Sequence, residues 1–336
     1  MKKHGYKFLL TEDSEGRSSP LRWISRILKA NAIPVRSVDL TSLTLRQWSS
    51  ELRSAEALIF IRYRRADAVF RRQIHQAKLA GVKTVRYWVG SDVLYCQRSD
   101  ALRKAAVALD AAVDLNVAVS PELVEKLRAL GVDAKLVPSF ASMPDCEGLM
   151  PDVLPRSVLA YLPGARAEFY GMTSVRRAAE AFPDLSFLLI GEDAPTLDDL
   201  PNVDTLSWVE NMEDVWARSG LLLRMTEHDG LPRMILEALY RYRQVVSTCR
   251  LPGVQHAEDD DTMMAAIAAF ARNPVPNLNG PAAANTLCAG AEDRLLSAIV
   301  SMNASSGQQL YHLAAITRLE AERLLSTIRQ GFRSKL

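Results

Sequence analysis

The stretch Leu221–Leu239, LLLRMTEHDGLPRMILEAL, decides the fold, because it reads as a buried strand that runs directly into a helix. Three consecutive leucines bounded by turn residues are typical of a strand in a parallel sheet. After Gly230, apolar residues recur from Ile235 at the i, i+3, i+4 and i+7 positions, which predicts a helix over 231–242 with one buried face. A strand, a glycine turn and an amphipathic helix are the repeating parts of an open α/β sheet.

The same alternation of short apolar strands and amphipathic helices extends over most of the 336 residues. In the first half we expect strands at 7–10, 35–40, 57–62, 82–89, 115–119 and 134–138. In the second half we expect strands at 157–162, 186–190, 205–209, 221–225 and 244–248. The clearest helices are predicted at 20–30, 121–130, 173–182, 212–218, 231–242 and 261–272. The fold class is therefore α/β, with parallel sheets.

Two domains suit the length of the chain. The first is expected over 1–145, and the irregular segment 146–156, rich in proline, methionine and acidic residues, is expected to be a linker. The second is expected over 157–290 and ends in the loose stretch 273–290, while 291–336 is predicted to be a helical tail.

Composition and charge narrow the class of protein. Apolar residues make up 48% and charged residues 24%, which is typical of a globular chain rather than a disordered one. No apolar run reaches the roughly 18 residues that cross a bilayer, and the N-terminus does not resemble a signal peptide. Four scattered cysteines suit a reducing compartment and argue against disulfides or a metal site. We therefore expect a cytoplasmic protein.

The turn after Arg224 can bind an anion. The first N–H groups of the following helix are unpaired by the helix itself, and Gly230 lets a ligand approach the backbone closely, so a phosphate would fit there. Arg233 and Glu237 lie four residues apart, so Glu237 either faces the same site or forms a weak surface ion pair of about 0.3 kcal/mol. The spacing alone favours neither.

A second loop, Tyr87–Asp92, follows a predicted strand of the first domain. Gly90, Ser91 and Asp92 are also the residues of ordinary turns and helix caps. Their position after a strand nevertheless makes them candidates for contact with a second substrate.

The residues then suggest a family. The segment Leu221–Leu239 resembles the donor site of GT-B glycosyltransferases, particularly glycosyltransferase family 4, with Asp229 in place of the usual first Glu and Glu237 eight residues later. Similar pieces are PGAR with Arg166, LIGED, WVGSDV and AVSPELVEKLRALGVDAKLVPSF, spread in order between about 82 and 272. The resemblance implies two Rossmann-like domains plus the C-terminal helices, and the transfer of a sugar from a nucleotide donor.

Roles for individual residues follow from this resemblance. Glu237 would bind the ribose hydroxyls, Asp229 would meet the sugar and phosphates, and Arg166 would neutralise the departing diphosphate. The remaining donor-side candidates are Gly191, Val209, His228, Gly230, Leu231 and Arg233. His228 would touch the sugar, or is a solvated loop residue. The acceptor-side candidates are Trp88, Gly90, Ser91 and Asp92, with Asp92 as a base or an orienting acceptor.

Two departures qualify the resemblance. Members often carry a Lys-Gly pair after the arginine, whereas this chain has Tyr170-Gly171, so Arg224 or Arg233 would have to replace the missing cation. Val89 stands where related sequences often have histidine, and transfer with retention, in which the departing phosphate takes the acceptor's proton, needs no protein base. No cofactor or metal is implied, and the donor is expected to be a UDP- or GDP-sugar.

The acceptor is expected to be a glycan or a lipid-linked molecule. Alternatives are a nucleotide-sugar epimerase or hydrolase of the same fold, a non-catalytic sugar-binding protein of two domains, or an inactive member that serves as a partner subunit.

Basic residues gather in the first domain, where 1–150 hold 24 Lys and Arg against 16 Asp and Glu. Eleven of these cations lie within 62–104. They form either a solvated face or a surface for anionic lipid, which would place the protein peripherally on the inner face of the membrane. The nearby aromatic residues Trp48, Phe70, Tyr87 and Trp88 would suit such a surface. No nucleic-acid-binding motif accompanies the charge.

Overall fold

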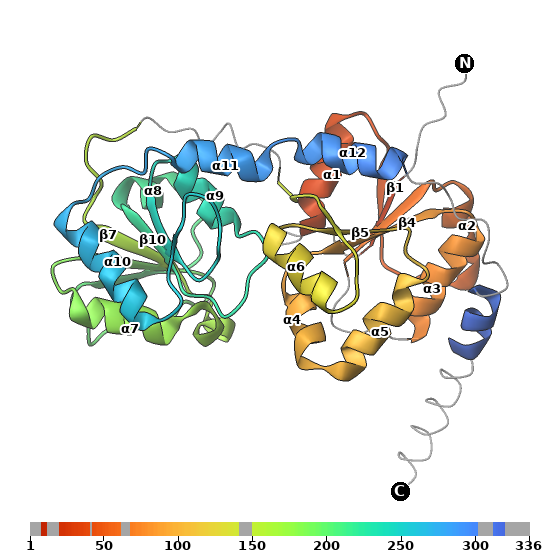
Figure 1. Ribbon diagram of the computed structural model, residues 1–336, viewed down its shortest axis with the longest axis horizontal. Coiled ribbons are helices and arrows are strands. Elements are labelled where there is room, and N and C mark those ends of the chain that lie inside the picture. The colour runs from red at the N-terminus through yellow and green to blue at the C-terminus, as the bar shows by residue number, and fades with distance from the viewer. Residues whose placement is uncertain are drawn as a thin grey trace, which may run out of the picture. The chain divides into compact units, whose positions relative to one another are not determined.

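The computed structural model describes residues 8–11, 20–40, 42–61, 68–140, 150–301 and 312–319. The chain forms two compact units, of which the first comprises 1–141 together with 290–336 and the second comprises 142–289 (Figure 1). The residues after Gly290, which read as a tail in the sequence, therefore count with the first unit. No helix of the described residues combines the length and apolar character needed to cross a bilayer.

The first unit is built on a six-stranded parallel sheet in the order β2-β1-β3-β4-β5-β6. Its strands are β1 (Phe8–Thr11), β2 (Val35–Val38), β3 (Ala57–Phe60), β4 (Lys83–Trp88), β5 (Leu115–Ala118) and β6 (Lys135–Leu136). Its helices are α1 (Pro20–Ala30), α2 (Leu45–Arg53), α3 (Ala68–Leu79), α4 (Ser91–Arg98), α5 (Asp100–Asp110), α6 (Pro121–Ala129) and α12 (Ala291–Val300). Every strand connection passes through a helix or a loop, as parallel pairing requires.

The second unit is built on a six-stranded parallel sheet in the order β12-β11-β10-β7-β8-β9. Its strands are β7 (Ser157–Tyr161), β8 (Ser186–Ile190), β9 (Val203–Leu206), β10 (Leu221–Arg224), β11 (Gln244–Ser247) and β12 (Gln255–His256). Two short 3-10 turns, η2 (Gly164–Arg166) and η3 (Glu168–Tyr170), follow β7. The helices are α7 (Met172–Ala181), α8 (Glu213–Arg218), α9 (Arg233–Tyr240), α10 (Asp260–Arg272) and α11 (Gly280–Cys288).

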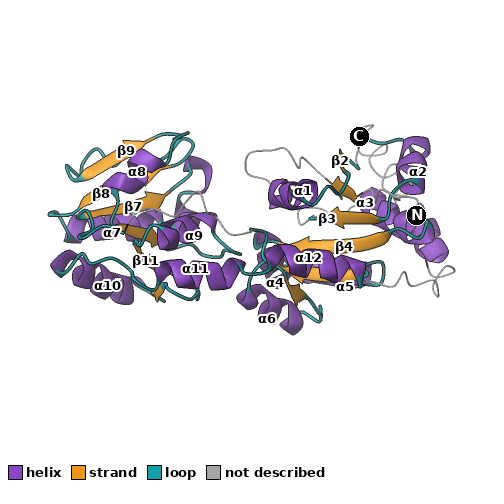
Figure 2. Ribbon diagram, turned by 90° about the horizontal axis from the view of Figure 1, so that it is seen from above, coloured by secondary structure: helices purple, strands orange, loops and turns teal. Residues whose placement is uncertain are grey.

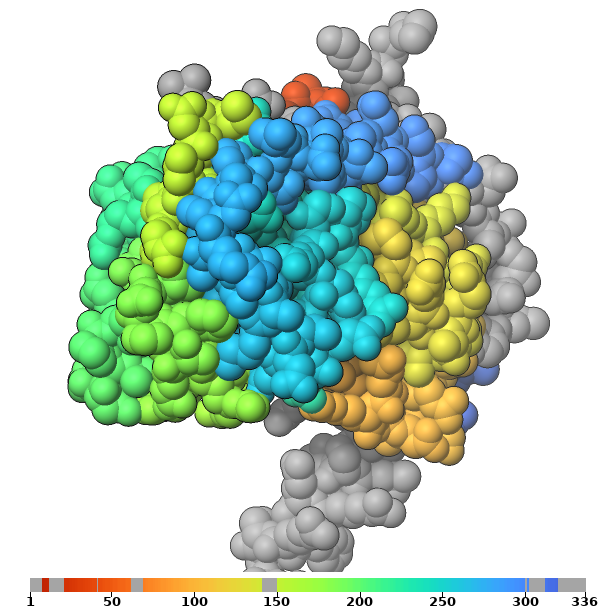
Figure 3. All heavy atoms as spheres, turned by 60° about the vertical axis from the view of Figure 1, so that its left-hand side comes forward, coloured from red at the N-terminus to blue at the C-terminus, as the bar shows by residue number. Residues whose placement is uncertain are grey.

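Helices cover both faces of the second sheet. In Figure 1, α7 and α10 lie on one face, and α8, α9 and α11 lie on the other. The core between α7, α10 and the sheet contains the fully buried side chains of Val175, Phe187 and Ile267. Figure 3 shows residues of α10 and α11, in blue, on the outer face that this view presents. The arrangement confirms an α/β unit whose central strands are buried on both sides, as their apolar sequences predicted.

Two sequence predictions for the second unit were wrong. The strand expected at 205–209 is β9, over Val203–Leu206, so Val209 lies in the following loop. The stretch 273–290, expected to be irregular, contains α11, which begins at Gly280 with Pro281 in its first turn. Proline presets the helical backbone at that position, so the Gly-Pro pair that suggested a loop instead starts a helix.

The C-terminal residues complete the first unit. Asn31 Nδ2, after the end of α1, donates a hydrogen bond to the Glu292 carboxylate in the first turn of α12. Lys83 Nζ donates to the carbonyl oxygen of Ile299 near the other end of α12, at 3.1 Å. A further helical segment, 312–319, contacts α3 through His312 and His75, whose Nδ1 atoms lie 3.0 Å apart. Figure 2 shows helices above and below this sheet.

The loops after β7 and β10 approach each other too closely for a side chain at Gly171. Gly171 has φ +85°, and a β-carbon added there would lie 2.3 Å from the carbonyl oxygen of Met225. Gly131 also has φ +85°, but nothing lies within 4 Å of an added β-carbon. The two glycines share the same backbone strain, and only Gly171 adds a steric clash.

This contrast predicts different costs for the two alanine variants. We expect Gly131→Ala to lower the free energy of unfolding by about 1 kcal/mol through backbone strain, and Gly171→Ala to lower it by at least about 3 kcal/mol. Denaturant titrations of both variants against the parent chain measure these losses. Equal losses would mean that the loop after β10 moves aside at little cost.

Candidate functional site

The second sheet changes direction between β7 and β10. From this central pair, the chain adds β8 and β9 on one side and β11 and β12 on the other. In open parallel sheets, ligands bind beyond the carboxyl ends of the strands at such a switch point. Leu223 lies opposite Ala160 in the register, so the last residues of the two strands, Tyr161 and Arg224, emerge side by side. The loops that follow them form the candidate site.

The loop after β7 brings Arg166 against two aromatic rings. Its guanidinium carbon lies 4.2 Å from the ring centre of Phe169 and 5.3 Å from that of Tyr170. Tyr170 in turn packs edge-to-face on Tyr161, with 5.3 Å between ring centres. Such cation–π contacts restrict where the arginine can lie while leaving its N–H donors available to an anion. The side chain of Arg166 is thus held over this edge of the sheet.

Arg224 reaches the same aromatic cluster from β10. Its guanidinium carbon lies 5.0 Å from the Tyr170 ring centre and 5.8 Å from that of Tyr161. Tyr170 therefore contacts both arginines, at the position where the Lys-Gly pair of the resemblance would place a lysine. Arg224 had been named from the sequence as one of two possible replacements for that lysine. The geometry favours Arg224 over Arg233, which lies a turn away on α9.

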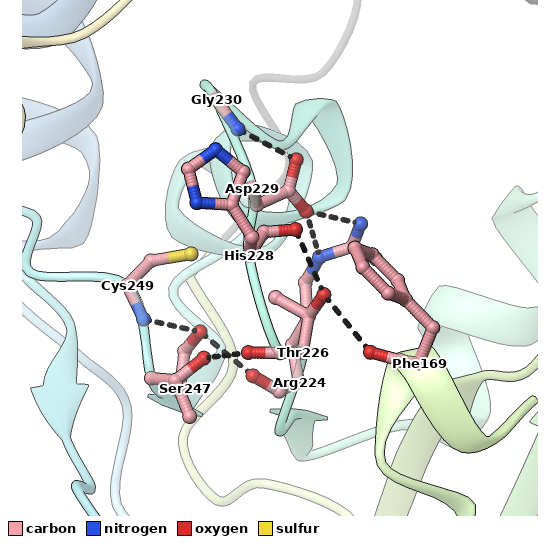
Figure 4. Close-up of polar contacts among 9 residues, drawn as sticks. Phe169, Arg224, Thr226, His228, Asp229, Gly230, Ser247 and Cys249 are labelled. Atoms are coloured by element: carbon pink, nitrogen blue, oxygen red, sulfur yellow. Dashed lines mark hydrogen bonds and ion pairs between the residues drawn. The ribbon is translucent and has the colours of Figure 1, made fainter. Parts of the chain in front are cut away.

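Asp229 links Arg224 to the start of the next helix. Its Oδ2 accepts from Nε and Nη2 of Arg224 at 2.9 and 2.5 Å, and its Oδ1 accepts from the backbone N–H of Gly230 at 2.9 Å. Figure 4 shows the carboxylate between these two donors. Burial disfavours charge on Arg224, but the paired Asp229 raises its pKa above the ordinary arginine value. The guanidinium therefore stays charged although only 8% of the residue is exposed.

Backbone contacts hold the two loops together. Phe169 supplies its carbonyl oxygen to the N–H of Glu227 at 2.9 Å and to the Thr226 hydroxyl at 3.3 Å. The Thr226 hydroxyl also donates to the carbonyl oxygen of His228 at 3.1 Å (Figure 4). His228 itself is 7% exposed, so the prediction of a solvated loop histidine was wrong. The contacts fix the turn that precedes α9.

The N-terminus of α9 carries no side-chain cap. Pro232 occupies the N-cap position, and none of its neighbours donates a capping hydrogen bond there. Gly230 and Leu231 are buried in the turn immediately before it. The first amides of α9 and its dipole therefore add to the positive potential of Arg224 and Arg166.

Glu237 lies one turn into α9 and pairs with Arg233. The distance from Arg233 Nε to Glu237 Oε1 is 2.6 Å, and the two side chains are 45% and 11% exposed. The ion pair left open in the sequence thus forms, but with the Glu237 carboxylate largely buried rather than on the surface. A buried acceptor at this end of α9 is compatible with a role in binding hydroxyl groups.

Glycines shape the neighbouring loop after β8. Gly191 has φ +148°, and an added β-carbon would lie 2.9 Å from the backbone nitrogen of Pro163. A β-carbon on Gly164 would lie 2.1 Å from the carbonyl oxygen of Asp193. These contacts bring the loops after β7 and β8 together. Val209, the other predicted base contact, is half-buried in the loop after β9 and follows the exposed Trp208.

Asp92, the predicted acceptor-side base, is engaged by its own loop. Its carboxylate accepts from the backbone N–H groups of Val89, Gly90 and Val93, with Gly90 nearest at 2.8 Å. Burial raises its pKa, against the opposing effects of these amides and of Arg86. At 2% exposure, the carboxylate is turned away from solvent and is unsuited to take a proton from an acceptor. The structure instead assigns it to the turn between β4 and α4, where Ser91 is half-buried.

Trp88 is likewise part of the core rather than an acceptor contact. The residue has no exposed surface, and its indole N–H donates to Asn116 Oδ1 at 3.1 Å. The guanidinium carbon of Arg86 lies 3.8 Å from the Trp88 ring centre. Burial lowers the pKa of Arg86 to about 10. Trp88 therefore screens a buried arginine from the surrounding apolar side chains.

The basic stretch 62–104 does not form the aromatic surface expected from the sequence. Trp48, Phe70, Tyr87 and Trp88 are each at most 2% exposed and belong to the core. Among the cations, Arg72, Lys78 and Arg86 are also buried. The prediction of an interfacial aromatic patch was therefore wrong. Three further cations of this stretch, Arg62, Arg64 and Arg65, lie outside the described residues.

Within the described ranges, no cluster of three or more His, Cys, Asp or Glu side chains has a geometry that could hold a metal ion. The charged groups of the candidate site are instead dominated by the two arginines. This arrangement can bind an anion directly, because guanidinium groups match the geometry of phosphate oxygens.

Sequence reasoning missed the aromatic part of the site. Tyr161 and Phe169 were not singled out, and Tyr170 was noted only for the lysine it replaces. The signal available was positional, since Tyr161 ends a predicted strand at the sheet's centre. No periodicity predicts that Tyr170 would contact arginines from two different strands, because that contact depends on the strand order.

Known proteins resemble this chain in fold but not in sequence. No family model matches the chain, and no curated protein sequence matches it. Among solved structures, HepE of Anabaena in complex with UDP and glucose has a TM-score of 0.67 and 13% identity, covering 88% of this chain and 100% of that one. Sucrose-phosphate synthase from Thermosynechococcus elongatus has a TM-score of 0.56 and 14% identity, covering 92% and 99%.

A third neighbour is the pneumococcal O-GlcNAc transferase GtfA in complex with UDP and GlcNAc, with a TM-score of 0.51 and 11% identity. This match covers 73% of the present chain and 56% of GtfA. The three structures confirm the GT-B fold of two Rossmann-like units that the sequence predicted. Assignment to family 4 stays a prediction.

The Arg224–Asp229 pair predicts a measurable coupling energy. In a double-mutant cycle of Arg224→Met and Asp229→Asn, we expect a coupling above about 1.5 kcal/mol, because the pair is largely buried and hydrogen-bonded twice. The exposed Arg218–Asp204 pair, at 2.9 Å with side chains 55% and 52% exposed, serves as the control. That pair should give less than about 0.5 kcal/mol in denaturant titrations. A coupling near zero at Arg224–Asp229 would contradict the geometry.

Proposed function

We propose that this chain is a glycosyltransferase that takes a sugar from a nucleoside-diphosphate sugar. The observation that carries the proposal is the pair of arginines in contact with Tyr170, at the switch point of the second sheet and beside the uncapped start of α9. The HepE and GtfA structures hold UDP, which supports a nucleotide donor. The donor is thus expected to bind through the second unit.

The chemistry follows from where charge develops. When the bond between the sugar and the diphosphate breaks, negative charge grows on the leaving β-phosphate. Cations and helix N–H groups already in place stabilise that charge without reorganising at the moment of reaction. Arg166 is the better placed of the two arginines to meet the phosphate, since it is half-exposed whereas Arg224 is buried and paired. Arg224 would hold Asp229 and the turn in position.

Asp229 occupies an anion's place in the ligand-free chain. Its carboxylate lies between the Arg224 guanidinium and the Gly230 amide, two donors that a phosphate would also seek. We expect the donor's sugar hydroxyls to meet Asp229 and the phosphates to meet Arg166 and the α9 amides. Leu231 would contribute a backbone N–H, and His228, Gly191 and Val209 would border the sugar or the base.

The acceptor and the stereochemistry belong to the same proposal. Because the Asp92 carboxylate is buried in its own loop, we propose that transfer proceeds with retention and that the leaving phosphate takes the acceptor's proton. The reaction then needs neither a protein base nor a metal ion. A glycan or lipid-linked acceptor would be met by the first unit, whose exposed cations, such as Arg98 and Lys104, suit an anionic partner or membrane surface.

Glu237 predicts a defect in nucleotide binding that its matched control lacks. We expect Glu237→Gln to weaken the binding of UDP or GDP about 10-fold, since a buried acceptor for hydroxyl groups is lost. Glu180→Gln removes the same partner from another Arg-to-Glu pair four residues apart, Arg176–Glu180 on α7, and should leave binding unchanged. Calorimetric titration measures both affinities. Identical affinities in the two variants would count against Glu237 as a nucleotide ligand.

Arg166 predicts a defect in turnover. We expect Arg166→Gln to slow the release of UDP from a UDP-sugar about 100-fold, with a smaller effect on donor affinity, because its contact strengthens as charge develops. Arg177→Gln, which changes an exposed arginine of α7, is the control. An equal loss in donor affinity and turnover would reduce Arg166 to a ground-state contact. Donor consumption without transfer would favour the epimerase or hydrolase, and binding without turnover would favour a sugar-binding protein.

A further inference from the structure

A second basic cavity lies in the first unit, away from the site proposed above. Its volume is about 280 Å³, and three helical segments line it. Arg71 and His75 come from α3, Ala108 and Leu109 from α5, and Arg318 and Leu319 from the C-terminal segment 312–319. The described side chains that line it are basic or apolar.

Two cations meet at this cavity from different parts of the chain. Arg71 and Arg318 are far apart in sequence, and only the return of the chain to the first unit brings them to one cavity. His75, 4% exposed, contributes an imidazole to the same lining. Like charges placed around one cavity repel each other unless an anion lies between them.

The histidine pair behind the cavity shows the same excess of positive charge. His75 and His312 share a contact of 3.0 Å between their Nδ1 atoms, so at most one of these two nitrogens carries a hydrogen. Burial, then His312, then Arg71 lower the pKa of His75 to about 4. Burial and Lys78 lower the pKa of His312, while Asp114, which pairs with Lys78, acts in the opposite direction. Both rings are therefore neutral near pH 7.

We propose that this cavity binds a small phosphorylated molecule, with Arg71 and Arg318 as its phosphate ligands and His75 as an additional donor. A water molecule occupies about 30 Å³ of liquid, so the cavity holds several waters' volume, which exceeds a bare phosphate and falls below a nucleotide. The alanine and leucine side chains of the wall would face the uncharged part of the ligand.

Binding would have a structural consequence. A phosphate held by Arg71 and Arg318 at once would join α3 to the segment 312–319, adding a link to the contact between His75 and His312. The ligand would then stabilise the docked position of the C-terminal segment. This site is independent of the proposed donor site, because all of its described residues lie in the first unit.

The test uses the full chain and inorganic phosphate as the probe. Three proteins are compared at constant ionic strength: the parent chain, Arg71→Gln/Arg318→Gln, and the control Arg103→Gln/Lys104→Gln. The control removes the same charge from α5 at residues outside the cavity lining. We expect the parent and the control to bind phosphate with equal affinity and the first variant to bind at least 10-fold more weakly. Equal weakening in both double variants, or in neither, would overturn the site.

Two further measurements keep the result unambiguous. Sulfate, which keeps its charge as the pH is lowered, should raise the NMR-measured pKa of His75 in the parent chain by stabilising its protonated form. An unchanged pKa would overturn the proposal even where the variant fails to fold. UDP binding should be the same in the parent and in Arg71→Gln/Arg318→Gln, so failure at the donor site and failure here give different results.

A competition experiment identifies the source of the phosphate. Displacement of bound phosphate by glucose 6-phosphate supports a soluble phosphorylated ligand. Displacement only by vesicles of phosphatidic acid in phosphatidylcholine would overturn that assignment and favour a lipid headgroup.

Discussion

The close approach of two loops at the centre of the second sheet is the constraint on which the site depends. Gly171 leaves just enough room for the Met225 carbonyl, and Phe169 bonds to the backbone of the opposite loop. Because of this contact, Tyr170 lies where arginines from both loops can reach it. A bulkier residue at 171 would push the β7 loop away and separate the two cations. The charge of the site is thus set by backbone packing.

The sequence predicted most of the fold because the strands are short, apolar and regularly spaced. The helix α1 begins and ends where its proline start and apolar stripe predict, and β8 matches its predicted range. The errors have local causes. A Gly-Pro pair that starts α11 was interpreted as part of a loop, and the range expected for β9 extended past its end.

The candidate site was predicted less completely, because its residues come together only through strand order. Asp229, Gly230 and the α9 N-terminus were predictable from one continuous segment. The aromatic contacts of Arg166 and Arg224 join two strands that lie far apart in the sequence. Burial also misled the analysis at Trp88 and Asp92. A Gly-Ser-Asp turn after a strand indicates a ligand or a helix start equally well, and here the carboxylate caps its own turn.

The return of the chain to the first unit affects how the protein is made. Domains generally fold as units, with the N-terminal one first during synthesis. Here α12, which buries Leu295 and Ile299 within the first unit, leaves the ribosome only after the whole second unit. The first unit therefore waits, incompletely covered, while its neighbour is translated. Truncation at the C-terminus would damage the unit that was translated first.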